Sequence, residues 1–247
     1  MGTKDCSVCR FWNSSIGKKI LVALTGLVLV GFLAGHLAGN LLAFGGPGTA
    51  AVPAPLNAYA EWLHEHPLLV WGARAFLLFS LILHIVATVS LVRSNAAAKP
   101  IGYAVKKPQT STWASRLMIV SGLTIVTFVF LHLQHFTVRL GLADKVGYMD
   151  ANGSEVAFPL TTADGEKDVY HMLIDGFRSL PISLFYMLAI AFLCWHLSHG
   201  IASMFQTLGL NSRRTRPLTK GLGFAISGIY FLGYCSIPLA VLFGIIK

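Results

Sequence analysis

The amino-acid sequence predicts an all-α membrane protein, a single domain over residues 1–247 in which five transmembrane helices form a bundle. The first reason is composition, because 55% of the 247 residues are hydrophobic and only 12% are charged. A soluble domain has about 25% charged residues. The second reason is a set of five separate apolar stretches, each near the ~20 residues that a helix needs to cross a bilayer. The third is the placement of charged residues between these stretches.

The five apolar stretches occupy residues 20–44, 68–92, 117–140, 182–208 and 222–246. A run of good N-cap residues, Asn13-Ser14-Ser15, precedes the first stretch. Proline is favoured at helix starts, and Pro67 and Pro181 precede the second and fourth stretches. The first stretch is too long for the apolar region of a signal peptide, so we interpret it as a membrane-spanning helix.

Basic residues are concentrated in alternate connections. The N-terminal segment, the connection between the second and third helices and that between the fourth and fifth hold four, five and four of the 19 Lys and Arg residues. The other connections hold every acidic residue except Asp5. Because positively charged loops stay in the cytoplasm, we expect a cytoplasmic N-terminus and a C-terminus on the outer side. This distribution accounts for the formal net charge of +9 without a nucleic-acid partner.

The two outer connections, residues 45–67 and 141–180, are too short to form a separate catalytic domain. The second is polar and contains a possible hairpin at residues 150–153. No internal repeat and no low-complexity tract is apparent. Any chemistry is therefore expected within the helices or at their ends.

Four histidines lie inside four separate apolar stretches: His36, His84, His132 and His196. Ionisable residues at that depth are rare and usually face the bundle interior with a partner. Counting from the outer end of each stretch at about 1.5 Å per residue, His36 and His132 lie about 10–13 Å deep and the other two about 22–25 Å deep. The sequence therefore predicts an outer and an inner pair.

Two histidines that face each other across a bundle suit bis-imidazole haem ligation. Zinc needs three or four ligands close together, commonly with thiolate or carboxylate, and an ion-coupled transporter usually needs buried carboxylates; the five stretches contain no Asp or Glu. Gly31, Gly35 and Gly39 beside His36, and Gly200 after His196, leave room for a flat group. Ordinary helix–helix packing explains such small residues equally well.

A set of short motifs runs in order along nearly the whole chain. They are Ser15-Ile16-Gly17-Lys18-Lys19, Ala23-Leu24-Thr25-Gly26-Leu27, Gly35-His36-Leu37 with Gly39-Asn40-Leu41, Ala58-Tyr59-Ala60, His84 ahead of Asn95 and Ala97, His132-Leu133, His196-Leu197-Ser198-His199-Gly200 and Phe205-Gln206-Thr207-Leu208-Gly209-Leu210. In this set the chain resembles the cytochrome b membrane-anchor subunit of succinate:quinone oxidoreductases (succinate dehydrogenase) and quinol:fumarate reductases, in the form where one five-helix polypeptide carries two b haems.

The resemblance implies an electron-transfer subunit in the inner membrane of a prokaryote. A flavoprotein partner would hold the dicarboxylate site, and an iron–sulfur partner would exchange electrons with this chain, which passes them to or from a membrane quinone, menaquinone. No catalytic residue is then expected here. His84 and His196 would ligate the inner haem, nearer the iron–sulfur partner, and His36 and His132 the outer haem.

The resemblance also separates neighbouring histidines. In the family pattern the ligand comes first, which favours His196 over His199 and His132 over His135; the second histidine of each pair would lie at the haem edge. The other residues expected to contact haem are Gly35, Gly39, Gly200, Arg93 and Arg116. Some members carry a glutamate linked to proton movement two residues before the fourth-helix ligand. Cys194 occupies that position here, so the resemblance does not extend to proton transfer.

A quinone site is expected at the outer start of the second helix, where Glu61, His64, Glu65 and His66 could accept protons. A solvated loop end, or an inner quinone pocket near Ser115 and Arg116, are the alternatives. Two other functions stay open: a di-haem cytochrome b subunit of a hydrogenase or formate dehydrogenase, and a haem-free structural anchor.

Overall fold

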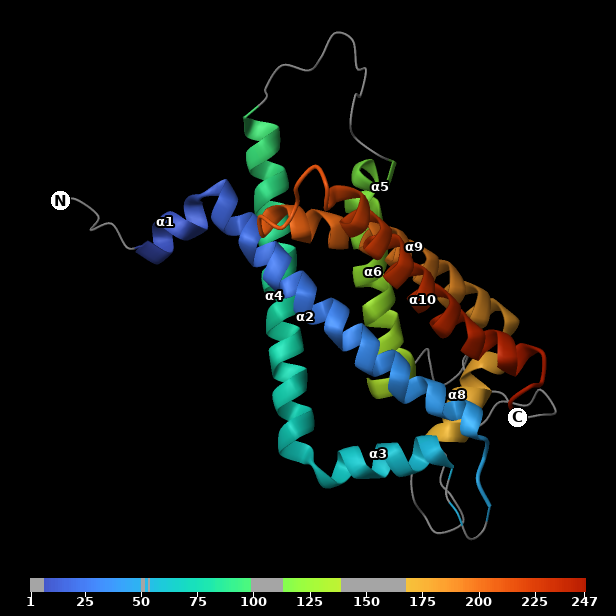
Figure 1. Ribbon diagram of the computed structural model, residues 1–247. Coiled ribbons are helices and arrows are strands. Elements are labelled where there is room, and N and C mark those ends of the chain that lie inside the picture. The colour runs from blue at the N-terminus through green and yellow to red at the C-terminus, as the bar shows by residue number, and fades with distance from the viewer. Residues whose placement is uncertain (1–6, 50–51, 53, 99–112, 139–167) are drawn as a thin grey trace.

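The computed structural model describes residues 7–49, 52, 54–98, 113–138 and 168–247, and its regular structure is helical throughout (Figure 1). Five helices are long and apolar enough to cross a membrane, as predicted. They are α2 (Ser15–Leu41), extended by the short 3-10 helix η1 (Leu42–Gly45); α4 (Pro67–Ala97); α6 (Met118–Leu133), extended by the π-helical turn η2 (Gln134–Val138); α9 (Leu180–Thr207); and α10 (Arg216–Leu242).

Four shorter helices lie outside these spans: α1 (Ser7–Asn13), α3 (Pro55–Glu65), α5 (Trp113–Arg116) and α8 (Val169–Arg178). The outer connections are thus more ordered than the sequence analysis expected, because α3 and α8 occupy parts of both. Proline at the first position favours the start of α3, and the Asp168 side chain caps α8 by accepting the His171 amide at 3.0 Å. The predicted hairpin at residues 150–153 lies outside the described residues.

Glycines end two of the membrane helices earlier than expected. Gly244 has φ +66°, and the amide of Ile245 reaches back to the Ala240 carbonyl at 2.8 Å, which closes α10 at Leu242 although apolar residues continue to position 246. Gly209, with φ +77°, closes α9 in the same way. This arrangement uses the left-handed conformation that glycine adopts without a Cβ penalty.

Helix packing gives the bundle a dense half and a looser half. Helices α9 and α10 pack along their length, and α2 lies against both of them as well as against α4. Helix α6 packs on α9, whereas among the described residues the main neighbours of α4 are only α2 and α3. Helices α4 and α6, which carry His84 and His132, are therefore not main neighbours of each other in the described part of the chain.

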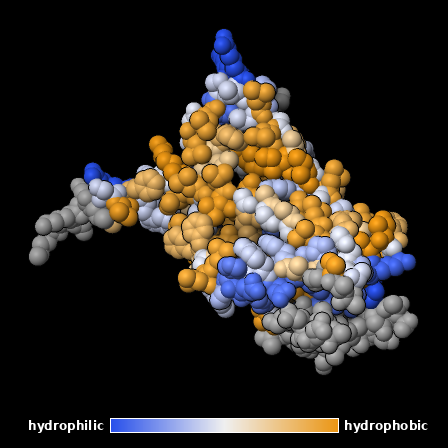
Figure 2. Space-filling model, turned by 60° about the horizontal axis from the view of Figure 1, so that its bottom comes forward, coloured by the Kyte–Doolittle hydropathy of each residue, from blue (hydrophilic) through white to orange (hydrophobic). Residues whose placement is uncertain are grey.

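The outer surface is strongly apolar, as expected for contact with lipid. Large apolar side chains such as Leu68, Phe224 and Leu232 are 87%, 68% and 71% exposed. Figure 2 shows hydrophobic residues spread over most of the visible surface, with hydrophilic residues gathered toward its edges. Soluble monomers rarely expose contiguous apolar surface on this scale.

Alternation of helix direction separates the charges of the described helix ends (Figure 1). The end of α4, the start of α6 and the connection from α9 to α10 lie at one end of the molecule, and this end carries Arg93, Arg116, Arg213, Arg214 and Arg216. The opposite end holds α3 and α8, with Glu61, Glu65, Asp168 and Asp175, and its basic residues include Arg178, which pairs with Asp175, and Lys247.

Candidate functional site

The two histidines expected in the outer layer, His36 on α2 and His132 on α6, are in direct contact. Their ring centroids lie 5.8 Å apart and their planes are nearly perpendicular, at 85°. Two bonds from imidazole nitrogens to one metal ion, each about 2 Å long, would place the centroids of two facing rings about as far apart. The structure therefore brings together a pair of the right spacing from two different helices.

Aromatic side chains enclose this outer pair. Phe32 stacks on His36 with a centroid distance of 5.3 Å, and Phe128 lies 5.8 Å from His132. The Nδ1 atom of His132 is buried and has no hydrogen-bond partner among the described residues. A buried polar atom without a partner is costly, so this nitrogen distinguishes His132 from His84 and His196, whose Nδ1 atoms have hydroxyl partners.

The inner pair, His84 on α4 and His196 on α9, is arranged differently. His84 Nδ1 lies 3.0 Å from the hydroxyl of Thr25 on α2, and His196 Nδ1 lies 3.1 Å from the hydroxyl of Ser121 on α6. These contacts direct His84 toward α2 and His196 toward α6. Each inner histidine is thus held by a hydroxyl from a neighbouring helix, at the side of the ring away from Nε2.

Glycines adjoin both inner rings. A Cβ atom on Gly26 would lie 3.5 Å from His84 Cε1, and one on Gly122 would lie 3.7 Å from His196 Cε1. The glycines expected from the sequence behave differently: a Cβ on Gly35 or Gly200 would meet no atom within 4 Å, whereas one on Gly39 would lie 2.8 Å from the Tyr59 ring. Gly39 therefore serves packing against α3, while Gly35 and Gly200 leave open space.

The second histidine of each neighbouring pair has a distinct environment. His135 is 5% exposed, its Nδ1 lies 2.9 Å from the Tyr186 hydroxyl, and its ring packs on Phe136 at 4.1 Å. His199 is half-buried and interacts electrostatically with His196 one turn away. His135 is thus part of the aromatic cluster at the C-terminal end of α6.

The four buried-segment histidines lie on four different helices, α2, α4, α6 and α9. Within the described parts of the chain, no group of three or more His, Cys, Asp or Glu side chains could hold a metal. A bis-histidine haem needs only two protein ligands per iron, and His36 and His132 form one contacting pair. The hydroxyl partners at Nδ1 of His84 and His196 fit such a group, because they leave Nε2 of both rings for the iron.

Known proteins offer no guide to this arrangement. No family model, no curated protein and no solved structure matches the chain.

Arg93 and Arg116, the cations expected near haem, lie at the same end of the bundle. Arg93 lines a groove of about 430 Å³ with Trp12 on α1 and Ser90 and Ser94 on α4. Arg116 lies over the Trp113 ring at 5.2 Å. Both arginines are exposed, at the level of the helix ends rather than beside the inner rings.

The residues expected at a quinone site lie on or next to α3. Glu61, His64, Glu65 and His66 are all exposed. The histidines bond within the segment, His64 Nδ1 to the Ala60 carbonyl and His66 Nδ1 to the Trp62 carbonyl, both at 2.7 Å. The structure therefore gathers these side chains at one surface without enclosing them.

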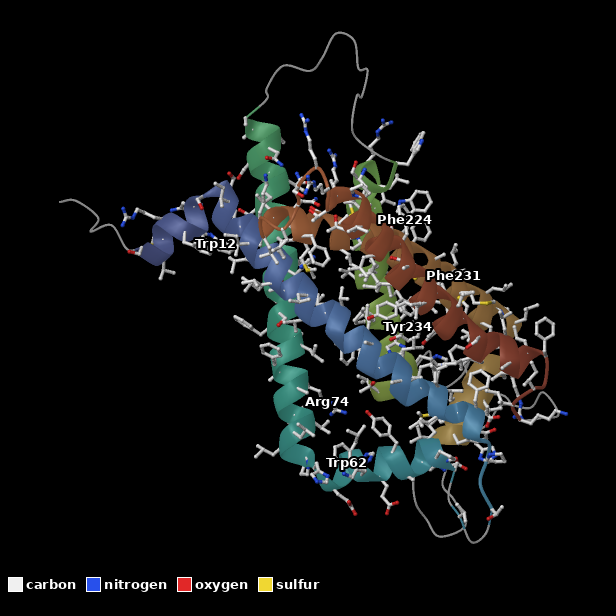
Figure 3. The ribbon with its side chains drawn as sticks, viewed as in Figure 1. Trp12, Trp62, Arg74, Phe224, Phe231 and Tyr234 are labelled. Carbon is white, nitrogen blue, oxygen red and sulfur yellow. The ribbon has the colours of Figure 1, made fainter. Side chains whose placement is uncertain are left out.

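Three notable residues were missed at the sequence level. Arg74 lies on α4 inside a membrane-spanning helix, with its guanidinium 4.9 Å from the Trp71 ring (Figure 3). Tyr230 and Tyr234 on α10 donate hydrogen bonds to the Val30 and Leu33 carbonyls of α2, at 2.9 and 2.7 Å. A charge inside an apolar stretch, and tyrosines four residues apart in one, are visible signals, because such groups need partners in a membrane.

Proposed function

We propose that this chain is the haem b-containing membrane anchor of a succinate:quinone oxidoreductase or quinol:fumarate reductase, which passes electrons between an iron–sulfur subunit and a membrane quinone. The observation that carries the proposal is the contact between the intramembrane His36 and His132 from two different helices, together with His84 and His196, each of which has a hydroxyl of another helix at Nδ1. Among the candidate di-haem cytochrome b families, the ordered motifs along the sequence favour the anchor-subunit family.

A haem held by two axial histidines shuttles single electrons and leaves no axial position for substrate. In the proposal His36 and His132 hold the outer haem, and His84 and His196 hold the inner one. Phe32 stacks against the outer pair, and the apolar helices around both pairs exclude water. The chain's own task is then to fix the ligand rings, to space the two sites and to keep them dry.

The charge separation supports an orientation in the membrane. Positively charged segments stay on the cytoplasmic side, so we infer that the end with Arg93, Arg116 and the arginines between α9 and α10 faces the cytoplasm of a prokaryote and docks the iron–sulfur and flavoprotein subunits. The C-terminus, α3 and α8 then lie on the outer side. The inner histidine pair is the pair nearer the docking face.

The proposed quinone, menaquinone, would exchange protons at the outer end. Glu61, His64, Glu65 and His66 are exposed titratable groups at that end of the bundle. They lie at the interface between lipid and water, where a quinone headgroup and water can both reach them. They are therefore the acceptors and donors that we propose for quinone protons.

The test is purification of the full chain with its natural partners, followed by a reduced-minus-oxidised spectrum. We expect b-type absorption from two haems and co-purification of a flavoprotein and an iron–sulfur subunit. A nickel- or molybdenum-containing partner would assign the chain to a hydrogenase or formate dehydrogenase instead. Absence of b-type absorption from the intact complex would leave only a structural anchor.

A further inference from the structure

Helices α2 and α6 contain a short internal repeat that the sequence analysis did not detect. Aligning residues 25–37 with residues 121–133 pairs Thr25 with Ser121 and gives identical residues at several further positions. These are Gly26 and Gly122, Leu27 and Leu123, Val30 and Val126, Phe32 and Phe128, His36 and His132, and Leu37 and Leu133. Because most identities are common membrane residues, the repeat stands out only when the structure gives its members equivalent contacts.

The equivalent contacts involve every distinctive position of the repeat. Phe32 and Phe128 each pack on the outer histidine four residues later. Gly26 and Gly122 each adjoin an inner histidine ring of another helix. Thr25 and Ser121 each contact the Nδ1 atom of that same ring, at 3.0 and 3.1 Å. Helix α2 thus contacts His84 of α4 through a hydroxyl and a glycine, and α6 contacts His196 of α9 through the equivalent two residues.

The spacing within the repeat puts both functions on one helix face. Thr25 and His36, like Ser121 and His132, are eleven residues apart. This is about three turns of 3.6 residues, or about 16 Å along the axis. Each of the two helices therefore carries one outer histidine and one hydroxyl that contacts an inner histidine of another helix. The histidine and the hydroxyl lie on the same face of the helix, about three turns apart.

The hydroxyl hydrogens are already committed to backbone carbonyls. Thr25 donates to the Leu21 carbonyl at 2.6 Å, and Ser121 donates to the Leu117 carbonyl at 3.0 Å. A hydroxyl has one hydrogen and two lone pairs, so toward the histidines these oxygens can act only as acceptors. When the hydroxyls donate to these carbonyls, each inner imidazole carries its hydrogen on Nδ1, which leaves the lone pair of Nε2 available.

We propose that Thr25 and Ser121 are matched positioning residues, which fix His84 and His196 in the Nδ1–H tautomer and direct Nε2 of both rings to one shared inner ligand. The identity of that ligand as haem rests on the proposed function. The tautomers of His84 and His196 do not depend on it. Partners that accept from the second imidazole nitrogen orient metal-binding histidines and raise their basicity. The repeat of α2 and α6 therefore provides an equivalent hydroxyl for each of the two histidines of the inner site.

The first test needs no haem. In the full chain, prepared without haem in lipid nanodiscs, ¹⁵N NMR of the histidine side chains should show protonated Nδ1 in both His84 and His196. Thr25→Val should change the tautomer of His84 only, and Ser121→Ala that of His196 only. Thr25→Ser and Ser121→Thr keep the hydroxyl and should preserve the tautomers.

The matched control is Ser227→Ala on α10, whose buried hydroxyl bonds only the Gly223 carbonyl of its own helix, at 2.7 Å. This variant should leave all tautomers unchanged. Protonated Nε2 in the wild-type rings, or unchanged tautomers in Thr25→Val and Ser121→Ala, would overturn the proposal.

The second readout uses the haem-loaded chain. Thr25→Val and Ser121→Ala should both weaken retention of the same haem, by about 10- to 100-fold, and raise its midpoint potential because the ligands become less basic, while the other haem is unchanged. Effects on two different haems, or on neither, would overturn the proposal. If the wild type binds no haem, the proposed function fails, and the tautomers still decide the role of Thr25 and Ser121.

Discussion

At the scale of single residues, the chemistry of this protein depends on what surrounds each imidazole. His36 and His132 touch each other, whereas His84 and His196 are held by hydroxyls from other helices. His135 is tied to Tyr186. Residues of one type thus have three environments, and the contacts distinguish them where sequence position alone does not.

Replacing the paired histidines tests the two layers. We expect His84→Ala and His196→Ala to remove one haem, and His36→Ala and His132→Ala to remove the other, so that each variant keeps about half of the b-type absorption. Redox titration identifies which haem remains. His64→Ala on exposed α3 is the control and should keep both haems. Loss of the same haem from all four variants would contradict the pairing.

At the scale of the helices, two tyrosines join α10 to α2. Tyr230 and Tyr234 are four residues apart, so they lie on one face of α10 and reach the Val30 and Leu33 carbonyls of α2. Figure 3 shows Tyr234 on the α10 ribbon close to α2. In a membrane such hydrogen bonds between helices stabilise modestly, because lipid provides no hydrophobic force between them.

We expect Tyr234→Phe to lower the free energy of unfolding by about 0.6–1.7 kcal/mol, since it removes one interhelical hydrogen bond and keeps the ring. Tyr230→Phe should have a similar effect. Unfolding of the purified chain in detergent, followed by tryptophan fluorescence, measures the difference. Tyr59→Phe on α3 is the comparison, and an equal loss of stability there would show that the hydroxyls of α10 have no special role.

The N-terminus of α8 is sensitive to pH through Asp168. Its carboxylate accepts from the His171 amide and from the Asn57 side chain, at 3.0 and 3.1 Å. Burial alone would raise the pKa of Asp168, but the hydrogen bonds from His171 and Asn57 outweigh burial, so the pKa lies below its ordinary value of 3.8. This contribution to stability is present above pH about 4 and is lost as the pH falls through the lowered pKa.

Amide hydrogen exchange in the first turn of α8 measures this effect. Asp168→Ala should cost the cap about 1 kcal/mol and speed exchange at neutral pH. Asp168→Asn keeps a capping side chain and removes the charge, so exchange should stay slow and become insensitive to acid in this range. An acid response that persists in Asp168→Asn would assign the titration to another group.

At the scale of the whole molecule, charge and topology act together. The basic helix ends gather at one end of the bundle and α3 and α8 at the other. Among the described residues, α4 packs mainly on α2 and α3, whereas α6 packs mainly on α9. Both features fit a bundle that docks partners at one end and holds groups between its helices.

Thiol labelling of intact cells tests the orientation. Cys9 is exposed on α1 at the end that we place inside, so a membrane-impermeant maleimide should label it only after the cells are opened. In a Glu65→Cys variant, the new thiol on α3 should be labelled from outside. Cys194 and Cys235 are buried and should stay unlabelled in both cases. External labelling of Cys9 would reverse the proposed orientation.

The sequence by itself determined the number of membrane helices and the approximate position of each, because length and apolarity are local properties of each stretch. It also identified His36, His84, His132 and His196, since a histidine in an apolar stretch is conspicuous. It did not predict α3 and α8, whose starts depend on contacts such as that between Asn57 and Asp168.

Only the tertiary structure decided which groups meet. Thr25 and Ser121 look like ordinary hydroxyl residues of membrane helices, which commonly bond their own backbone, and their roles appear only when α4 and α9 bring His84 and His196 beside them. The repeat shared by α2 and α6 has the same origin. Its meaning lies in contacts between helices, and these depend on three-dimensional packing rather than on the pattern of any single stretch.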